Sequence, residues 1–416
     1  MMIRIICIIL LLKSLLIHAQ STYSLNDDSA FIKQFETETL KTINDSIKAY
    51  NYLKLSTYYR LISDTVKAKA YLAKGVLMSQ PYPLLRGAAY YYQAHEHSGK
   101  LDIPFMELCL KKADSVLKDL KSQESLKLLS MIWHKYGVIQ QMKGDERAAI
   151  VTFTTKAAVY ADLSDDIISK AKVNKAIAII NMNAREWKKA TTYFQRSIQY
   201  LSQSPNNNPI YLEELVDTYL AAAVNHAYTG SMDSSKKLIQ KAKNILQPYP
   251  NSNLMFRYYF TEGTYYDRIA QYDKALNSFS RGISLAKYYN DQHAINKLKS
   301  GLHDSYVNKG DYPKAVELME ELIQSSSIVE QDKVKCYKKL YQDYAALGNT
   351  EKSVFWAKKY ITLNDSINTF VEKKDILEIE RRYNDAENKR QIALLQTEKE
   401  KAIDSSKNNR LLNWLL

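Results

Sequence analysis

A repeat of about forty residues constrains this chain more than any other feature of its sequence. Between residues 44 and 364 a small residue recurs every 38 to 45 positions, and a large apolar residue usually follows it four positions later. We call these positions the anchor column; seven of the eight are Ala or Ser, and they are Ala68, Met106, Ala149, Ala190, Ser235, Ala275, Ala315 and Ser353. Residues four apart share one face of an α-helix, so each unit is predicted to pack this face against a close neighbour.

A second column of mostly small residues lies twelve positions before the anchor. It contains Ser56, Ala94, Gly137, Ala178, Ala223, Gly263, His303 and Tyr341. Four positions earlier lies an aromatic column: Tyr52, Tyr90, Trp133, Asn174, Tyr219, Tyr259, Lys299 and Tyr337. Glycines at 144, 230, 310 and 348 then mark helix stops, and Asp, Asn or Ser usually follows as an N-cap. Each unit is therefore predicted to be two helices joined by a tight turn, although Asn174, Lys299, His303 and Tyr341 depart from the pattern.

These columns resemble the tetratricopeptide repeat. The unit from Trp133 to Phe153 is the most similar, and Tyr59, Tyr266, Tyr306 and Tyr344 occupy the family's tyrosine column. The units here are longer than the family's repeat. The resemblance implies an all-α, right-handed solenoid of about eight helix pairs, with a concave groove lined by the first helix of each pair.

Composition excludes several other classes of protein. Eleven glycines and eight prolines in 416 residues are few for a phosphate-binding loop, a dinucleotide-binding fold or a barrel of short strands. Three cysteines exclude a disulfide scaffold. The net charge of +13 is dispersed without a basic run, which argues against nucleic-acid binding.

The first residues predict export. Residues 1–19 have a positive start, an apolar run from Ile5 to Leu12 and the sequence Ile17-His18-Ala19, which is typical of a cleaved signal peptide. An uncleaved membrane anchor is the alternative. Residues 20–43 are predicted as a lead-in helix. In the mature chain Cys109 and Cys336 fall in distant units, so we expect two packed thiols and no bridge.

After the repeats, residues 365–410 are predicted to form one long helix. Ile376, Ile379, Tyr383, Ala386 and Ala393 are spaced as a short coiled-coil seam, which predicts a homodimer through residues 367–403. The alternative is a single charged helix that folds back on the last repeat. Residues 411–416, with Trp414 among leucines, are similar to the start of a membrane helix.

Taken together, the signal peptide, the repeats, the 379–396 segment and the apolar end resemble the periplasmic repeat-sensor regulators of bacteria. The resemblance implies a non-enzymatic protein- or peptide-binding module, the periplasmic sensory part of a transcriptional or kinase regulator. An inner-membrane tether at the C-terminal end is part of this expectation. The family's cytoplasmic output domain has no counterpart in this sequence. Two alternatives are a free-standing exported scaffold or adaptor and an enzyme built on a helical toroid.

The sequence contains no recognisable catalytic or metal-binding motif, and no cofactor is expected. His95 and His97 would point to opposite sides of a helix, so they cannot share a metal ion. The carboxylate pairs Asp165-Asp166 and Glu213-Glu214 are expected in loops or first turns of helices.

The concave groove is therefore the candidate site. First-helix positions that flank the small column should face inward, and the mixture of cations and aromatic rings there suits an extended peptide or an acidic ligand. A solvated face without a ligand is the alternative. The predicted groove residues are Tyr91, His95, His134, Gln141, Lys172, Lys175, Arg257, Phe260, Asp267, Lys335 and Lys338.

Overall fold

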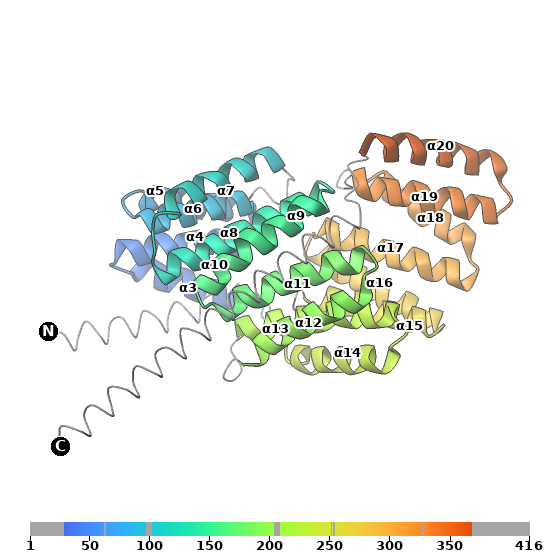
Figure 1. The fold of residues 1–416 in the computed structure, drawn as a ribbon, viewed down its shortest axis with the longest axis horizontal. Helices are drawn as coiled ribbons and strands as arrows, with labels where there is room; N and C mark the ends of the chain where they lie inside the picture. The colour runs from blue at the N-terminus through green and yellow to red at the C-terminus, as the bar shows by residue number, and fades with distance from the viewer. Residues whose placement is uncertain are drawn as a thin grey trace, which may run out of the picture.

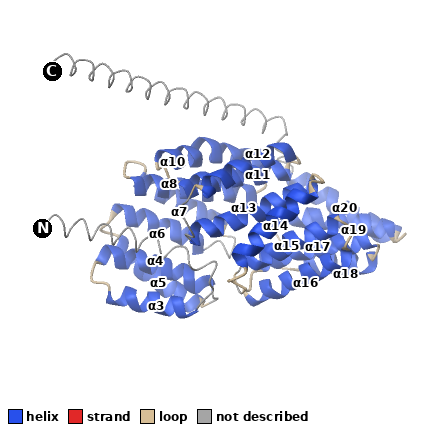
Figure 2. Cartoon of the chain, turned by 90° about the horizontal axis from the view of Figure 1, so that it is seen from below, coloured by secondary structure: helices blue, strands red, loops and turns tan. Residues whose placement is uncertain are grey.

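The computed structural model describes residues 29–367, apart from 62–63, 97–101, 204–208, 251, 253, 326–327 and 329. Within these residues the regular structure is entirely helical, with no strand (Figures 1 and 2). A leading helix, α3 (Ser29–Lys41), precedes eight helix pairs stacked in a curved array. The predicted all-α solenoid is therefore confirmed.

Every anchor residue falls in the second helix of a pair, and every residue twelve positions earlier falls in the first. The pairs are α4 (Asp45–Leu61) with α5 (Thr65–Ser79), α6 (Pro83–Glu96) with α7 (Ile103–Leu117), α8 (Gln123–Met142) with α9 (Glu146–Thr152), η2 (Phe153–Ala157) and α10 (Ala158–Leu163), α11 (Ile167–Asn183) with α12 (Trp187–Ser202), α13 (Pro209–Tyr228) with α14 (Met232–Leu246), α15 (Leu254–Arg268) with α16 (Tyr272–Tyr288), α17 (Gln292–Lys309) with α18 (Tyr312–Ile323), and α19 (Glu330–Ala346) with α20 (Thr350–Ile367). The first helices from α4 to α17 contact one another in succession and form an inner layer.

The small columns allow close packing within a pair. Phe153 and Phe279 are fully buried against the glycines of their first helices. A Cβ atom added to Gly137 would lie 2.6 Å from the Phe153 ring, and one added to Gly263 would lie 2.8 Å from the Phe279 ring. Both contacts would be too short, so a larger residue there would force the helices apart.

Where the anchor is serine, its hydroxyl group forms a hydrogen bond that confirms the predicted register. Ser235 donates to the backbone oxygen of Ala223 at 2.9 Å, and Ser353 donates to that of Tyr341 at 2.8 Å. In both pairs the acceptor lies twelve residues before the donor. Tyr341 therefore holds its predicted position although it is not small.

The turns within the pairs follow the predicted chemistry, except at Ser231. The four column glycines have φ between 71° and 87°, and Arg185 (60°) and Ala270 (58°) adopt the same left-handed conformation in other units. The side chains of Asp64, Asp102, Asp145, Asp311 and Asn349 accept the expected capping bonds from the following helix. Ser231 makes no such bond.

A cation column covers the aromatic column on the outside of the array. We define it as the position six residues after the anchor. The cations above rings of the aromatic column are Lys74, Lys112, Lys156, Lys241, Arg281 and Lys359, each 4.6 to 6.0 Å from a ring centroid. Each contact contributes about 0.5–1 kcal/mol at an exposed site. The dispersed positive charge therefore has a repeated structural role.

Two pairs depart from the sequence pattern of the cation and aromatic columns but keep the contact between these two positions. Lys156 follows its anchor by seven residues, because the π-helical turn η2 inserts one extra residue into that helix. In the seventh pair the aromatic position is Lys299 and the cation position is Glu321, and these two side chains form an ion pair of 2.7 Å. The departure at Lys299 is thus compensated by its partner.

We predict that Glu321→Lys lowers the free energy of unfolding by about 1 kcal/mol, because two ammonium groups would then face each other. The double variant Lys299→Tyr with Glu321→Lys should recover most of this loss by rebuilding the ring–cation contact. Urea unfolding of the wild type, the single variants Lys299→Tyr and Glu321→Lys, and the double variant measures the coupling between the two positions. Additive effects of the two substitutions would contradict the pairing.

Cys109 and Cys336 are buried free thiols, as expected. Among the described residues no helix is long and apolar enough to span a membrane. The predicted signal peptide, most of the predicted coiled-coil segment and the apolar end lie outside the described residues, so those expectations stay predictions.

Candidate functional site

Two neighbouring cavities lie on the inner layer of the array. The larger, of about 470 Å³, is lined by residues of α6, α8, α11, α13 and α15, together with Asp291 at the start of α17. The smaller, of about 310 Å³, is lined mainly by α15 and α17. Helix α15 is a shared wall: Phe256 and Arg257 face the larger cavity, and Phe260 and Thr264 face the smaller. The inner layer is therefore hollowed over several consecutive units.

The structure brings eight of the eleven predicted groove residues into these cavities. Those in the larger cavity are Tyr91, His95, His134, Lys172, Lys175 and Arg257. Phe260 and Asp267 line the smaller cavity. Gln141, Lys335 and Lys338 line neither of them.

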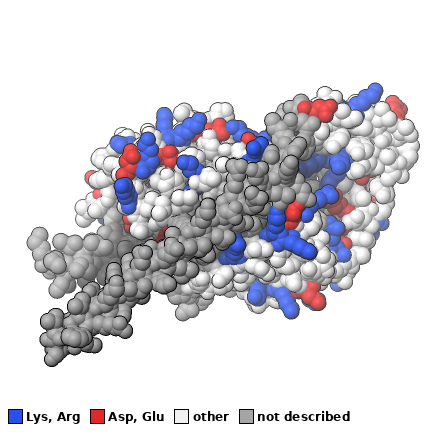
Figure 3. Space-filling view, viewed as in Figure 1, with Lys and Arg blue, Asp and Glu red and all other residues white. Residues whose placement is uncertain are grey.

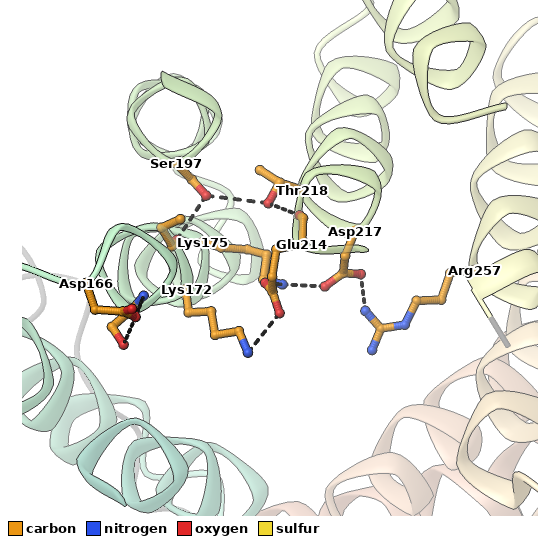
Figure 4. Close-up of polar contacts among 10 residues, drawn as sticks. Asp166, Lys172, Lys175, Ser197, Glu214, Asp217, Thr218 and Arg257 are labelled. Carbon is orange, nitrogen blue, oxygen red and sulfur yellow. Dashed lines mark hydrogen bonds and ion pairs between the residues drawn. The ribbon is translucent and has the colours of Figure 1, made fainter. Parts of the chain in front are cut away.

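An ion-pair network crosses the larger cavity (Figure 4). Glu214 on α13 accepts from Lys172 at 3.0 Å and from Lys175 at 2.8 Å, both on α11. Asp217, one turn further along α13, is 2.5 Å from Lys175 and also pairs with Arg257 on α15. The network thus ties together the first helices of three consecutive units.

The pKa values of this network fix its charges. Burial alone would raise the pKa of Glu214, but the ammonium groups of Lys172 and Lys175 lower it to about 2. Burial likewise opposes ionisation of Asp217, and the charges of Arg257 and Lys175 hold its pKa well below the usual value. All five side chains are therefore ionised at neutral pH, and Lys175 has its charge matched before any ligand arrives.

The two histidines of the cavity are neutral. Burial, together with the nearby charges of Lys172 and Lys175, lowers the pKa of His134 to about 3. The pKa of His95 is also well below its usual value because of burial and the charge of Arg60, which donates to His95 Nδ1 at 2.5 Å. Neutral imidazoles beside Tyr91 offer hydrogen bonds and ring surface to a ligand without adding charge.

Several cavity residues were not among the predicted ones. Asp217 and Lys297 occupy the column six residues before the small position, which also holds Lys172 and Arg257, so the same rule could have found them. Lys135 occupies a different column, and no pattern in the sequence marked it as a cavity residue. The Glu213-Glu214 pair was expected in a first turn, but this is wrong, because both residues lie in the second turn of α13 and Glu214 is part of the network.

The smaller cavity contains cations and carboxylates from adjacent units. Asp267 accepts from Ser305 at 2.8 Å and from Asn308 at 2.9 Å. The Lys297 ammonium lies 4.6 Å from the centroid of the Phe260 ring, and the Arg268 guanidinium lies 4.2 Å from that of Tyr228. Aromatic surface and charge are thus presented together.

The curvature of the array brings distant units within electrostatic reach of one another. Burial raises the pKa of Glu146 on α9, and the charge of Lys335 on α19 acts against that rise. Lys335 also acts on Lys297. Lys335 therefore influences the groove although it lines neither cavity.

No group of three or more metal-ligating side chains occurs in the described part of the chain. On the face drawn in Figure 3, blue Lys and Arg are interspersed with red Asp and Glu. The visible surface therefore carries mixed charge.

Comparisons with known proteins agree on the fold. No protein-family model matches the chain, and no curated protein sequence matches it. The Rap protein complexed with competence and sporulation factor has a TM-score of 0.52 at 16% identity, over 81% of this chain and 92% of that one. The apo quorum sensor NprR from B. thuringiensis has a TM-score of 0.53 at 13% identity, over 80% of this chain and 91% of that one.

A human protein shares the arrangement as well. The IFIT1 dimer with m7Gppp-AAAA has a TM-score of 0.52 at 13% identity, over 84% of this chain and 75% of that one. At such identities the likeness defines the fold and leaves the ligand open. The chain is a tetratricopeptide-like repeat protein.

We predict that Glu214→Gln lowers the free energy of unfolding by about 3 kcal/mol, because two cavity lysines lose a shared counter-charge. Glu107→Gln, which breaks a more exposed pair with Lys143, should cost less than about 1 kcal/mol. Chemical denaturation at pH 7 checks both values.

The loss of unfolding free energy caused by Glu214→Gln should also depend on pH. The pKa of Glu214 is depressed to about 2, so its contribution is present above its ordinary pKa and is lost as the pH falls towards 2. The difference between wild type and Glu214→Gln should therefore shrink between pH 5 and pH 2. A difference that stays constant would show that the charge of Glu214 is not responsible.

A second titration is predicted between the last two pairs. His303 is buried, which favours the neutral form, but hydrogen bonds to Asp304 (2.9 Å) and Asp343 (2.7 Å) raise its pKa. Its stabilising effect is therefore full below the unfolded pKa and is lost as the pH rises through the raised folded value.

Consequently, His303→Gln should destabilise the protein more at pH 6 than at pH 9. His293→Gln, a surface control, should show no such difference. Thermal melts at both pH values would measure this, and an equal loss at both would show that His303 acts only by packing.

Proposed function

We propose that this chain is a non-enzymatic peptide- or protein-binding module whose ligand lies extended along the inner layer. The observation that carries the proposal is the pair of cavities that share α15 as a wall. A compact metabolite would need one enclosed pocket, whereas neighbouring hollows over consecutive units suit a segment of chain.

The lining of the cavities supports the same ligand class. Tyr91, Phe256 and Phe260 offer ring surface, and the neutral imidazole of His134 offers hydrogen-bonding groups. A peptide needs both, because its side chains alternate with a polar backbone. The Rap protein, which shares the fold, was solved in a complex with competence and sporulation factor, and this adds support for a binding role.

The likeness to IFIT1 raises RNA as a second candidate, because that structure contains m7Gppp-AAAA. The charge of the larger cavity favours a peptide. It is lined by four cations and four carboxylates, and a nucleic-acid backbone with a negative charge on every phosphate would meet repulsion there.

We further propose that the module is exported and forms the sensory part of a membrane-bound transcriptional or kinase regulator. A free-standing exported scaffold is the alternative. The support is the sequence of residues 1–19 and 365–416. N-terminal sequencing of the protein from its native host should find Gln20 first, and a start at Met1 would remove the support for export.

We predict that Val138→Trp abolishes peptide binding while the fold is retained. Val138 is half-buried and lines the larger cavity, so an indole there would fill the space that a ligand needs. The matched control is Val159→Trp, on the exposed side of α10. The assay is enrichment of a phage-displayed library of random 12-residue peptides on immobilised full-length protein.

The expected result is selective enrichment by the wild type and by Val159→Trp, with none by Val138→Trp. Circular dichroism should show that all three are folded. Equal enrichment by all three proteins, or none by the wild type, would refute a peptide site in the larger cavity.

A further inference from the structure

The six carboxylates that line the two cavities are already engaged, Glu213 through its electrostatic attraction to Lys172. Glu214 and Asp217 are held by Lys172, Lys175 and Arg257. Asp291 caps α17 by accepting from the backbone of Ala294 at 2.9 Å. In the smaller cavity Asp267 is held by Ser305 and Asn308, and Asp304 accepts from Lys339 at 2.6 Å.

Three cations in the cavities have no such match among the residues that the structure describes. Lys135 in the larger cavity forms no ion pair or hydrogen bond with any of them. In the smaller cavity Lys297 and Arg268 each lie over an aromatic ring and likewise form no ion pair or side-chain hydrogen bond with that described part. The formal numbers of charges are close to balance, but these three unmatched groups are all positive.

The surroundings of Lys135 and Lys297 destabilise their charged forms when no ligand is bound. Burial, together with the nearby charge of Arg60, lowers the pKa of Lys135 to about 8. Lys297 is open to solvent in the groove, yet the concave walls remove enough hydration to lower its pKa to about 8. A carboxylate placed beside either ammonium would reverse this loss.

We propose that the groove recognises an acidic peptide that carries two carboxylates, one at Lys135 and one between Lys297 and Arg268. This inference rests on the proposed peptide-binding function and adds the chemistry of the ligand. The two contacts lie at different cavities, so the distance between the carboxylates sets specificity. A ligand carboxylate can be a side chain or the C-terminal group.

A peptide fits this pattern better than RNA does. The cavities that hold the three unmatched cations are also lined by fixed carboxylates on α13, α15 and α17. A peptide can place its charges at the two cation sites and remain neutral between them. An RNA strand would carry a phosphate past every carboxylate.

The test uses fluorescein-labelled, C-terminally amidated 12-residue peptides of Ala, Ser and Tyr with two glutamates. Two to six residues separate the glutamates, which covers about 10–23 Å in an extended chain. Matched peptides carry glutamine instead, and a second set ends in a free carboxylate. Fluorescence anisotropy with the full chain measures each affinity at low and moderate salt.

One spacing should bind best, and its glutamine counterpart should bind at least about tenfold more weakly. Lys135→Gln and Lys297→Gln should each reduce affinity about tenfold, and each should lose sensitivity to only one of the two glutamates. Lys338→Gln, an exposed lysine outside both cavities, is the matched control and should change nothing. Tighter binding of the free-acid set would identify the C-terminal group as one of the two carboxylates.

Three outcomes would overturn the proposal. If the glutamine peptides bind equally well and Val138→Trp still abolishes binding, the peptide-binding function stands and the acidic ligand is wrong. If no peptide binds at any spacing, both proposals fail. If fluorescein-labelled A10 RNA binds more tightly than every peptide and loses affinity in Lys135→Gln and Lys297→Gln, the groove is a nucleic-acid site.

Discussion

The close packing of the helices depends on large side chains that lie against glycine or another small residue of a first helix. Phe279 lies against the backbone of both Gly263 and Gly301, so one ring closes its own helix pair and reaches the next. Phe153 makes the corresponding contact with Gly137. These contacts set the distance between the two helices of a pair, and that distance sets how the first helices stack. The other pairs pack at the same register, mostly through small residues, and the curvature of the inner layer follows from this repeated packing.

Charge in this protein is divided between two layers with different tasks. On the outside, single cations cover the rings of the aromatic column and are largely independent of one another. On the inside, Lys172, Lys175 and Arg257 are bound into a network with carboxylates from a neighbouring helix. The outer cations stabilise each pair locally, whereas the inner network couples consecutive pairs. This division explains how a chain with a net charge of +13 can line its larger cavity with equal numbers of positive and negative groups.

The sequence predicted the fold well, because a repeat presents the same packing problem eight times and an error in one unit is corrected by the others. Tyr341 and Lys299 illustrate this, since neither fits its column and both helices still fall in register. The site was predicted less completely. Inward-facing positions followed from the columns, but the role of Lys175 depends on Glu214, which is 39 residues away on a different helix. Such pairing across units is set by the curvature of the array, which no local pattern encodes.

The ion pair of Lys299 and Glu321 has a consequence for how such an array can change by duplication or recombination. In the other pairs with a ring–cation contact, the two partners are of the same kind, so a crossover between the first and second helix joins compatible halves. A crossover between α17 and α18 would instead place Glu321 against a ring, or Lys299 against a second cation. Such a hybrid pair would lose about 1 kcal/mol of stability, so exchange of the whole seventh pair costs less than exchange of one of its helices.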